Sequence, residues 1–208
     1  GFTAGRGRGR RRPRAPTVRR GAARPRGAWR RCPARECGAA GDLGGHEGGT
    51  EGDDDLVGTD GDDTIDARGG NDSIRPGRGD DTVFGGAGDD GIVMHLNDFG
   101  AAEQVGNDVL DGGGGTDWIL FAAESVSSTY AVTIDLDAGT YGIADPAGAN
   151  SGSVVDIENV LGSAYADTIL GNGDANHLEG LSGADRIEGR GGNDQLVGGF
   201  GSQRLSGG

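Results

Sequence analysis

Aspartate recurs at intervals of nine residues along much of the chain, each time two positions before an aliphatic side chain. In Gly77–Val93 (GRGDDTVFGGAGDDGIV), two Asp-Asp pairs lie nine residues apart, and a glycine precedes each pair. Carboxylates that stack in register repel one another unless a cation lies between them. Oxygen-rich sites of this kind suit hard divalent cations. The spacing therefore indicates repeated cation sites rather than a single catalytic centre.

The aspartates belong to two runs of nine-residue blocks. The first run begins at Gly58 (GTDGDDTID, ARGGNDSIR, PGRGDDTVF, GGAGDDGIV) and continues without a gap to Leu120, and the second begins at Gly162. Only the block 94–102 breaks the first run, with Phe99 in sixth position. Most sixth positions are Asp, and we predict that these residues bind the metal. They are Asp63, Asp72, Asp81, Asp90, Asp108, Asp117, Asp167, Asp185 and Asp194.

The period also predicts the elements that position these carboxylates. Positions seven to nine suit a three-residue strand whose aliphatic eighth side chain points inward. Positions one to six are rich in glycine and suit a tight turn. Because so short a strand is unstable alone, it must stack on copies of itself. Two blocks then form a flattened coil of eighteen residues with parallel sheets on two faces, and successive coils lie about 4.8 Å apart.

Calcium is the cation that we expect in these turns. It accepts six to eight oxygens in flexible geometry, including carboxylates and backbone carbonyls, whereas magnesium requires a tight octahedron. Zinc requires Cys or His ligands, and the blocks have neither at a fixed position. Cys32 and Cys37 lie outside the blocks, in a CPAREC segment whose spacing is a weak metal signal and leaves a local disulfide open.

The coil geometry sorts the carboxylates of the first run into two rows. If every block occupies half a coil, one row holds Asp63, Asp81, Phe99 and Asp117, and the other holds Asp72, Asp90 and Asp108. We therefore expect the best sites between Asp63 and Asp81, between Asp72 and Asp90, and between Asp90 and Asp108, with a weaker site at Asp117. We also expect the fifth-position residues Asp62, Asp80 and Asp89 to lend charge rather than to bind the ion.

The second run carries fewer carboxylates in sixth position. There Asp167 and Asp185 form one pair, Asp194 has the neutral neighbour Asn176, and Gln203 replaces the last Asp. Because the number of charged ligands tunes calcium affinity, this run should bind calcium more weakly than the first.

The block GGAGDDGIV matches the nonapeptide G-G-x-G-x-D-x-U-x, in which U is a large aliphatic residue. The sequence thus resembles the RTX, or haemolysin-type, calcium-binding family over Gly58–Leu120 and Gly162–Gly208. The resemblance implies an all-β fold, a parallel β-roll with calcium in its turns. It also implies a secreted, extracellular protein that is exported by type I secretion machinery and folds on calcium. We further expect the chain to be a piece of a longer protein.

Four segments are expected along the chain. Residues 1–52 form a disordered Arg-rich arm, residues 53–120 the first β-roll array, residues 121–161 an interrupting β segment, and residues 162–208 a second, truncated array. Within the interruption, the alternation of Val132, Ile134 and Leu136 predicts a strand. The segment Asp145–Ser151 is expected to be an exposed loop.

Composition and charge limit the other functions. Residues 1–50 carry thirteen Arg against three acids, whereas the remainder carries thirty acids against six Arg. The arm (Gly5–Pro16, GRGRGRRRPRAP) suits phosphate contacts, but the acidic remainder opposes nucleic acid, so we expect no nucleic-acid partner. The longest apolar run, Trp118–Ala123, is too short for a membrane span.

Two alternatives remain open from the sequence. The chain has no H-E-x-x-H or G-x-S-x-G motif, and His46, His95 and His177 are far apart, so it is not expected to be an enzyme by itself. It is alternatively the calcium-binding part of a secreted hydrolase whose catalytic domain lies elsewhere. A surface structural or adhesin role with a cell-surface partner is the other alternative, and Arg78-Gly79-Asp80 spells the RGD triplet.

Overall fold

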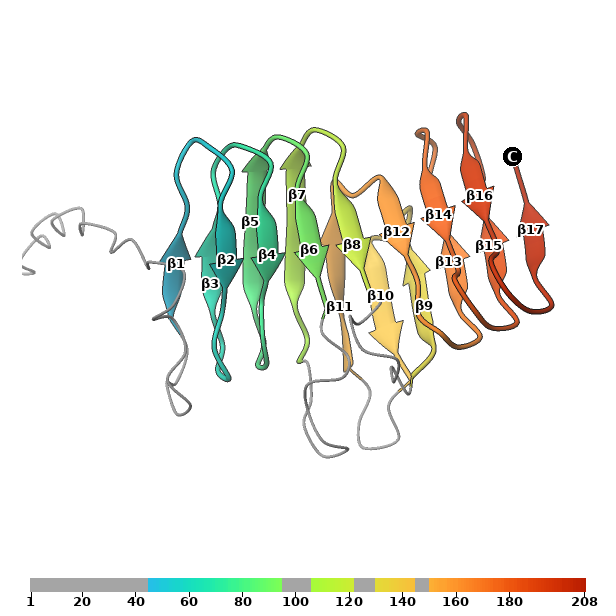
Figure 1. The fold of residues 1–208 in the computed structure, drawn as a ribbon, viewed down its shortest axis with the longest axis horizontal. Helices are drawn as coiled ribbons and strands as arrows, with labels where there is room; N and C mark the ends of the chain where they lie inside the picture. Colours follow the sequence, from blue (N-terminus) through green and yellow to red (C-terminus); the bar gives the residue numbers. More distant parts are fainter. Residues whose placement is uncertain (1–44, 95–105, 122–129, 145–149) are drawn as a thin grey trace, which may run out of the picture.

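A computed structural model describes residues 45–94, 106–121, 130–144 and 150–208 of the chain. Within these residues all regular structure is β, and two sheets run side by side along the molecule (Figure 1). Sheet A holds, in spatial order, β1 (His46–Gly48), β3 (Thr64–Asp66), β5 (Thr82–Ala87), β7 (Val109–Gly114), β11 (Asn150–Val155), β10 (Thr140–Ile143), β9 (Val132–Asp135), β13 (Thr168–Leu170), β15 (Arg186–Glu188) and β17 (Arg204–Ser206). Sheet B holds β2 (Asp55–Val57), β4 (Ser73–Arg75), β6 (Gly91–Val93), β8 (Trp118–Leu120), β12 (Asn159–Leu161), β14 (His177–Glu179) and β16 (Gln195–Val197).

The chain alternates between the two sheets, so that each pair of blocks completes one coil. Within the two arrays, neighbouring strands of the same sheet are parallel and in register, as Ile65 beside Val83 in sheet A and Ile74 beside Ile92 in sheet B show. The eighth-position aliphatics form the core between the sheets. Ile65, Ile74, Val83, Ile92, Leu110, Ile119, Ile169, Leu178 and Ile187 are all completely buried. The predicted parallel β-roll is confirmed.

The pairing of the described strands passes over the irregular block of the first run. β5 pairs directly with β7, and β6 pairs directly with β8, so strands 27 residues apart lie side by side, whereas 18 residues separate the other neighbouring strands within the two arrays. Met94, the first residue of that block, is buried in the core, and residues 95–105, including Phe99, lie outside the described residues. The predicted rows are therefore wrong beyond Asp90.

The interruption extends the stack. β9, β10 and β11 form an antiparallel meander in sheet A, which joins β7 on one side to β13 on the other by parallel pairing. In sheet B, β12 alone spans the same interval between β8 and β14. The expected loop at Asp145–Ser151 is wrong for Asn150 and Ser151, which lie in β11. Residues 145–149 lie outside the described residues.

The roll also begins earlier than the sequence indicated. β1 pairs with β3, and β2 belongs to a further block, GTEGDDDLV at residues 49–57, with Asp54 in sixth position. The arm boundary at residue 52 is thus placed too late. The predictions for Cys32, Cys37 and the rest of residues 1–44 lie outside the described residues. Among the described residues, no helix is long and apolar enough to cross a membrane.

Candidate calcium-binding turns

The sixth-position carboxylates form a ladder along each side of the roll. In most of them, one carboxylate oxygen (Oδ1) accepts the backbone N–H of the sixth residue in the preceding coil, whereas Asp167 Oδ1 accepts the N–H of Val132 in the interruption. Asp81 Oδ1 lies 2.8 Å from the Asp63 nitrogen, and Asp90 Oδ1 lies 2.8 Å from the Asp72 nitrogen. These hydrogen bonds fix the carboxylates at the edge of the core, where Asp81 and Asp90 are each 1% exposed.

The structure corrects which carboxylates are neighbours. Asp108 Oδ1 accepts the N–H of Asp81 at 3.0 Å, and Asp117 Oδ1 accepts the N–H of Asp90 at 2.7 Å. The predicted pair of Asp90 and Asp108 is therefore wrong, and Asp117 completes a row with Asp72 and Asp90. The predicted neighbours Asp63 and Asp81, Asp72 and Asp90, Asp167 and Asp185, and Asn176 and Asp194 do lie in contact.

Five of these carboxylates have a second oxygen (Oδ2) that is buried and has no hydrogen-bond partner. We call them the open carboxylates: Asp72, Asp81, Asp90, Asp117 and Asp185. A buried carboxylate oxygen without a partner is costly, and each open carboxylate is at most 3% exposed. Such an oxygen fits the ligand of a cation.

Burial raises the pKa of every open carboxylate. For Asp81 desolvation is the main cause, the backbone hydrogen bond from Asp63 opposes it, and the nearby Asp108 and Asp63 carboxylates raise the pKa further, to about 8. Desolvation likewise raises the pKa of Asp72 and of Asp117 to about 6. Without a cation these groups therefore resist ionisation.

Glycine in first position keeps space beside the open carboxylates in several blocks. A Cβ atom at Gly85 would lie 2.5 Å from Asp90 Oδ2, and one at Gly180 would lie 2.6 Å from Asp185 Oδ2. Among the described residues, no three Asp, Glu, His or Cys side chains converge on one point. The remaining ligands in such a turn would have to be backbone carbonyls and water, a ligand mixture that calcium accepts.

Other sixth-position carboxylates have protein donors at the second oxygen. We call them the closed carboxylates: Asp54, Asp63, Asp108 and Asp167. Asp63 Oδ2 accepts from the backbone nitrogen and the hydroxyl of Thr59, at 2.5 and 2.9 Å. The other three are closed by Thr50, Tyr141 and Ser163, respectively. Asp54 was missed by the sequence analysis, although its block repeats the pattern.

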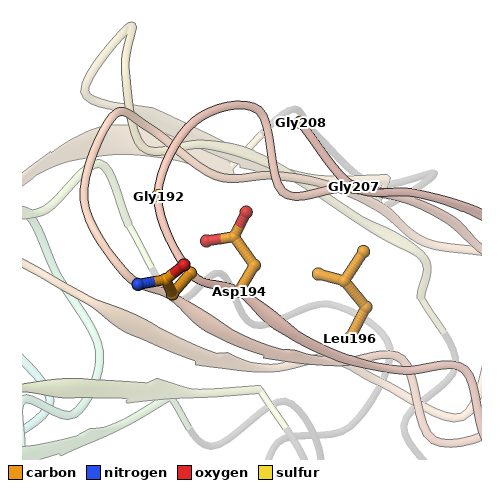
Figure 2. Close-up of a pocket in the computed structure, with 6 residues that line it drawn as sticks. Gly192, Asp194, Leu196, Gly207 and Gly208 are labelled. Atoms are coloured by element: carbon orange, nitrogen blue, oxygen red, sulfur yellow. The ribbon is translucent and has the colours of Figure 1, made fainter.

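Asp194 stands apart from both groups. One oxygen accepts the Asn176 N–H at 3.0 Å, and the half-buried carboxylate points into a pocket of about 380 Å³ lined by Gly192, Gly207 and Gly208 (Figure 2). This turn therefore offers its carboxylate to a pocket rather than to a closed coil.

The fifth-position residues form an additional ladder that the sequence analysis did not predict. Asp62 Oδ1 accepts the N–H of Asp80 at 3.0 Å, and Asp80 Oδ1 accepts the N–H of Asn107 at 2.9 Å. On the other side, Asn71 and Asp89 continue the same pattern. These side chains are exposed, as expected, but they also tie successive coils together. The recurrence of polar residues at the fifth position of neighbouring blocks was the sequence signal that could have predicted this ladder.

The class defined by this geometry is a parallel β-roll with a carboxylate in each nine-residue turn. The family model for the RTX calcium-binding nonapeptide repeat matches residues 48–83, 77–93, 105–123, 156–183 and 170–205, which together cover more than half of the chain. The chain belongs to the RTX calcium-binding repeat family, whose nonapeptides are calcium-binding motifs. No curated protein matches the chain.

Proposed function

We propose that calcium binding by the open carboxylates completes the fold of this module after export from the cell. The observation that carries the proposal is the set of five buried, unpartnered Oδ2 atoms at Asp72, Asp81, Asp90, Asp117 and Asp185. A bound cation would neutralise carboxylates that the core otherwise desolvates. Asp194 joins these ligands through its pocket. The closed carboxylates Asp63, Asp108 and Asp167, which the sequence also predicts as ligands, already accept hydrogen bonds at Oδ2.

The stacking of the coils explains why binding and folding would be linked. Each carboxylate receives an N–H from the preceding coil, so the ligand arrangement exists only when two coils are stacked. An ion that binds only the folded state stabilises it by about 2.7 kcal/mol at a hundredfold excess over Kd. With Kd on the order of 10⁻⁴ M, as for extracellular calcium modules, cytosolic calcium adds almost nothing and millimolar calcium adds over about 1 kcal/mol per site.

This linkage supports a secreted module. Several such sites acting together would keep the chain unfolded at low calcium and fold it outside the cell. Members of the family are generally secreted, and an unfolded chain before export is compatible with type I secretion. The acidic character of residues 51–208, with thirty acids against six Arg, disfavours a compact calcium-free state through self-repulsion.

The test is the circular dichroism of the full chain in calcium-depleted buffer and during titration with calcium. We expect no β signal without calcium, a cooperative gain of β signal near millimolar calcium, and no comparable gain with magnesium at the same concentration. A chain that shows its full β signal in calcium-depleted buffer at neutral pH would contradict the proposal.

A further inference from the structure

The blocks adopt one of two turn conformations, which differ at the second residue of the block. In blocks with an open carboxylate, the second residue has positive φ, for example Arg68 (φ 76°), Gly86 (φ 107°) and Leu181 (φ 65°). The fourth residue of these blocks is a glycine that also has positive φ, such as Gly88 (φ 131°). A Cβ there would lie 2.0 Å from the Gly70 carbonyl oxygen, so that this turn requires glycine.

Blocks that begin GT or GS adopt the other conformation, in which the hydroxyl forms a relay. Thr59 Oγ1 accepts the N–H of Gly61 at 3.2 Å and donates to Asp63 Oδ2 at 2.9 Å. The backbone nitrogen of Thr59 donates to the same oxygen at 2.5 Å. Two donors thus occupy the oxygen that is left without a partner in an open turn. Neither Thr59 nor Gly61 has positive φ.

The same relay recurs at two other blocks. Thr50 donates to Asp54 Oδ2 through its nitrogen at 2.6 Å and its hydroxyl at 2.8 Å. At Ser163 the nitrogen donates to Asp167 Oδ2 at 2.6 Å and the hydroxyl to Oδ1 at 2.7 Å. Three independent blocks therefore place a hydroxyl against the sixth-position carboxylate.

A fourth block shows what happens when this conformation lacks a hydroxyl. Asn172 occupies the second position. Its side-chain oxygen accepts the N–H of Asp174 at 2.9 Å, and its backbone nitrogen donates to Asn176 Oδ1 at 3.0 Å. The sixth residue of this block is the neutral Asn176 instead of an aspartate. Where the hydroxyl donor is missing, the charge that it would stabilise is missing too.

The turns that are closed by their own second-position residue lie near the start of each array, whereas Asp108, which Tyr141 closes, lies farther along the first array. Thr50 and Thr59 lie in the first two blocks of the first array, one before a strand of sheet B and one before a strand of sheet A. Ser163 and Asn172 lie in the corresponding blocks of the second array. Open turns come after them in both arrays, from Asp72 and from Asp185 onward. Each array therefore starts with one coil whose turns are complete in hydrogen bonds.

We propose that the second-position hydroxyls of Thr50, Thr59 and Ser163 take the place of calcium at their carboxylates. The first coil of each array then needs no metal in its turns and provides the surface on which the calcium-dependent coils stack. Calcium ligation is assigned to the open carboxylates, and Asp63 and Asp167 are removed from the ligands that the sequence predicted. This inference rests on the proposed function, because it distributes the calcium sites of the same module.

The test compares two neighbouring carboxylates of the same row, Asp63 (closed) and Asp81 (open). The bound calcium of the full chain is counted by native mass spectrometry and by equilibrium dialysis at saturating calcium, with the β signal as the check of folding. We expect Asp63→Asn to bind as many ions as the parent chain and Asp81→Asn to bind at least one fewer. Equal losses in the two variants would overturn the inference, whereas a parent chain that binds no calcium would overturn the proposed function instead.

A second pair of variants covers the case in which Asp63→Asn does not fold. Thr59→Val removes the relay hydroxyl and leaves the carboxylate. The control, Thr64→Val, removes a hydroxyl from the strand of the same block, and this hydroxyl forms no hydrogen bond with Asp63 in the structure. We expect Thr59→Val to keep at least the parent number of ions but to need roughly twofold more calcium to fold, since the first coil loses a metal-independent contact. Thr64→Val should match the parent chain in the number of bound ions and in the calcium concentration needed to fold. A lower ion count in Thr59→Val, or a folding midpoint equal to that of Thr64→Val, contradicts the inference.

Discussion

The two arrays share one fold but connect their coils by different means. The first array ties successive turns through fifth-position side chains such as Asp62, Asp80 and Asn107. The second array has Ala166, Ala175 and Ala184 at that position and lacks this ladder. Instead, the side chain of Arg190 links one turn of the second array to Asp135 in the interruption. Open carboxylates and fifth-position ties between turns are therefore more numerous in the first array.

The side chain that links the second array to the interruption is Arg190. Its guanidinium donates to both oxygens of Asp135, at 2.6 and 2.8 Å, and to the Gly171 carbonyl at 2.7 Å. This bidentate ion pair lowers the pKa of Asp135, mainly through the side-chain hydrogen bond from Arg190. The second array thus gains a fixed ion pair, whereas the first array carries more open carboxylates. The comparison indicates that calcium dependence should differ along the roll.

The largest expected effect is that of pH on the calcium-free chain. In the folded state the pKa of Asp81 is raised to about 8, and the pKa values of Asp72, Asp117 and Asp167 are raised to about 6, from 3.8, in each case mainly by burial. Raised pKa values favour the folded state at low pH, and this contribution is lost as pH rises from about 4 through about 8. In calcium-depleted buffer, the chain should therefore be unfolded at pH 8 and should gain β signal as the pH falls to 5.

This pH effect is measured by the circular dichroism of the full chain in calcium-depleted buffer at pH 5, 6.5 and 8. Saturating calcium serves as the control, because a bound cation favours the ionised carboxylates and should reduce or reverse the pH dependence. A calcium-free roll that is more stable at pH 8 than at pH 5 would show that the open carboxylates are already stabilised by the protein.

The next effect compares an open carboxylate from each array. Asp90 lies between the Asp72 and Asp117 carboxylates of its row, whereas Asp185 has the closed Asp167 on one side and Gln203 on the other. Asp90→Asn should therefore reduce the stabilisation by calcium more than Asp185→Asn, by about 2–3 kcal/mol against about 1 kcal/mol. Isothermal titration and calcium-dependent urea unfolding of both variants give these values. Equal losses would mean that the two arrays bind calcium alike.

A smaller effect is expected at the junction of the two arrays. The Tyr141 hydroxyl donates to Asp108 Oδ2 at 2.7 Å and accepts the Asp108 N–H at 3.3 Å, and its ring lies 5.8 Å from that of Phe121. Tyr141→Phe keeps the ring but leaves a buried carboxylate short of a donor. The free energy of unfolding at saturating calcium should fall by about 1–3 kcal/mol. Tyr130→Phe, which alters a half-buried tyrosine packed against the same core, should change it little, and a similar loss in both variants would contradict a specific role for Tyr141.

The sequence predicted the roll because each block carries its own strand and turn. Ile65 and its equivalents in eighth position require burial at a period of nine, and only stacked coils provide it for strands of three residues. The direct pairing of β5 with β7 and of β6 with β8 was not predictable in this way, because block 94–102 contains nine residues and preserves the alignment on both sides. The closure of Asp108 by Tyr141 leaves no periodic signal either, since the meander brings together residues 33 apart. The hydroxyls of Thr59 and Ser163 did leave a signal in the sequence, because their blocks have Thr or Ser in second position instead of the glycine of GGAGDDGIV.

The smallest expected effect concerns the fifth-position ladder that distinguishes the arrays. Asp80→Ala removes the acceptor of the Asn107 N–H, whereas Asp80→Asn keeps an acceptor and removes only the charge. The difference in the free energy of unfolding between the two variants therefore isolates the hydrogen bond. We expect Asp80→Ala to be less stable than Asp80→Asn by about 0.5–1 kcal/mol in urea unfolding at saturating calcium.

The reverse change, Ala184→Asp, places an acceptor below the corresponding turn of the second array. It should raise the stability by about 0.5 kcal/mol if an N–H of the next coil is within reach. Because a side chain at this position is exposed, a new charge is screened by salt. The gain should therefore persist in 0.5 M NaCl if it comes from the hydrogen bond, and it should change with salt if it comes from charge. If Ala184→Asp does not raise the stability while Asp80→Ala lowers it, the ladder requires an unbroken row of polar residues, and a single polar residue is not enough to form it.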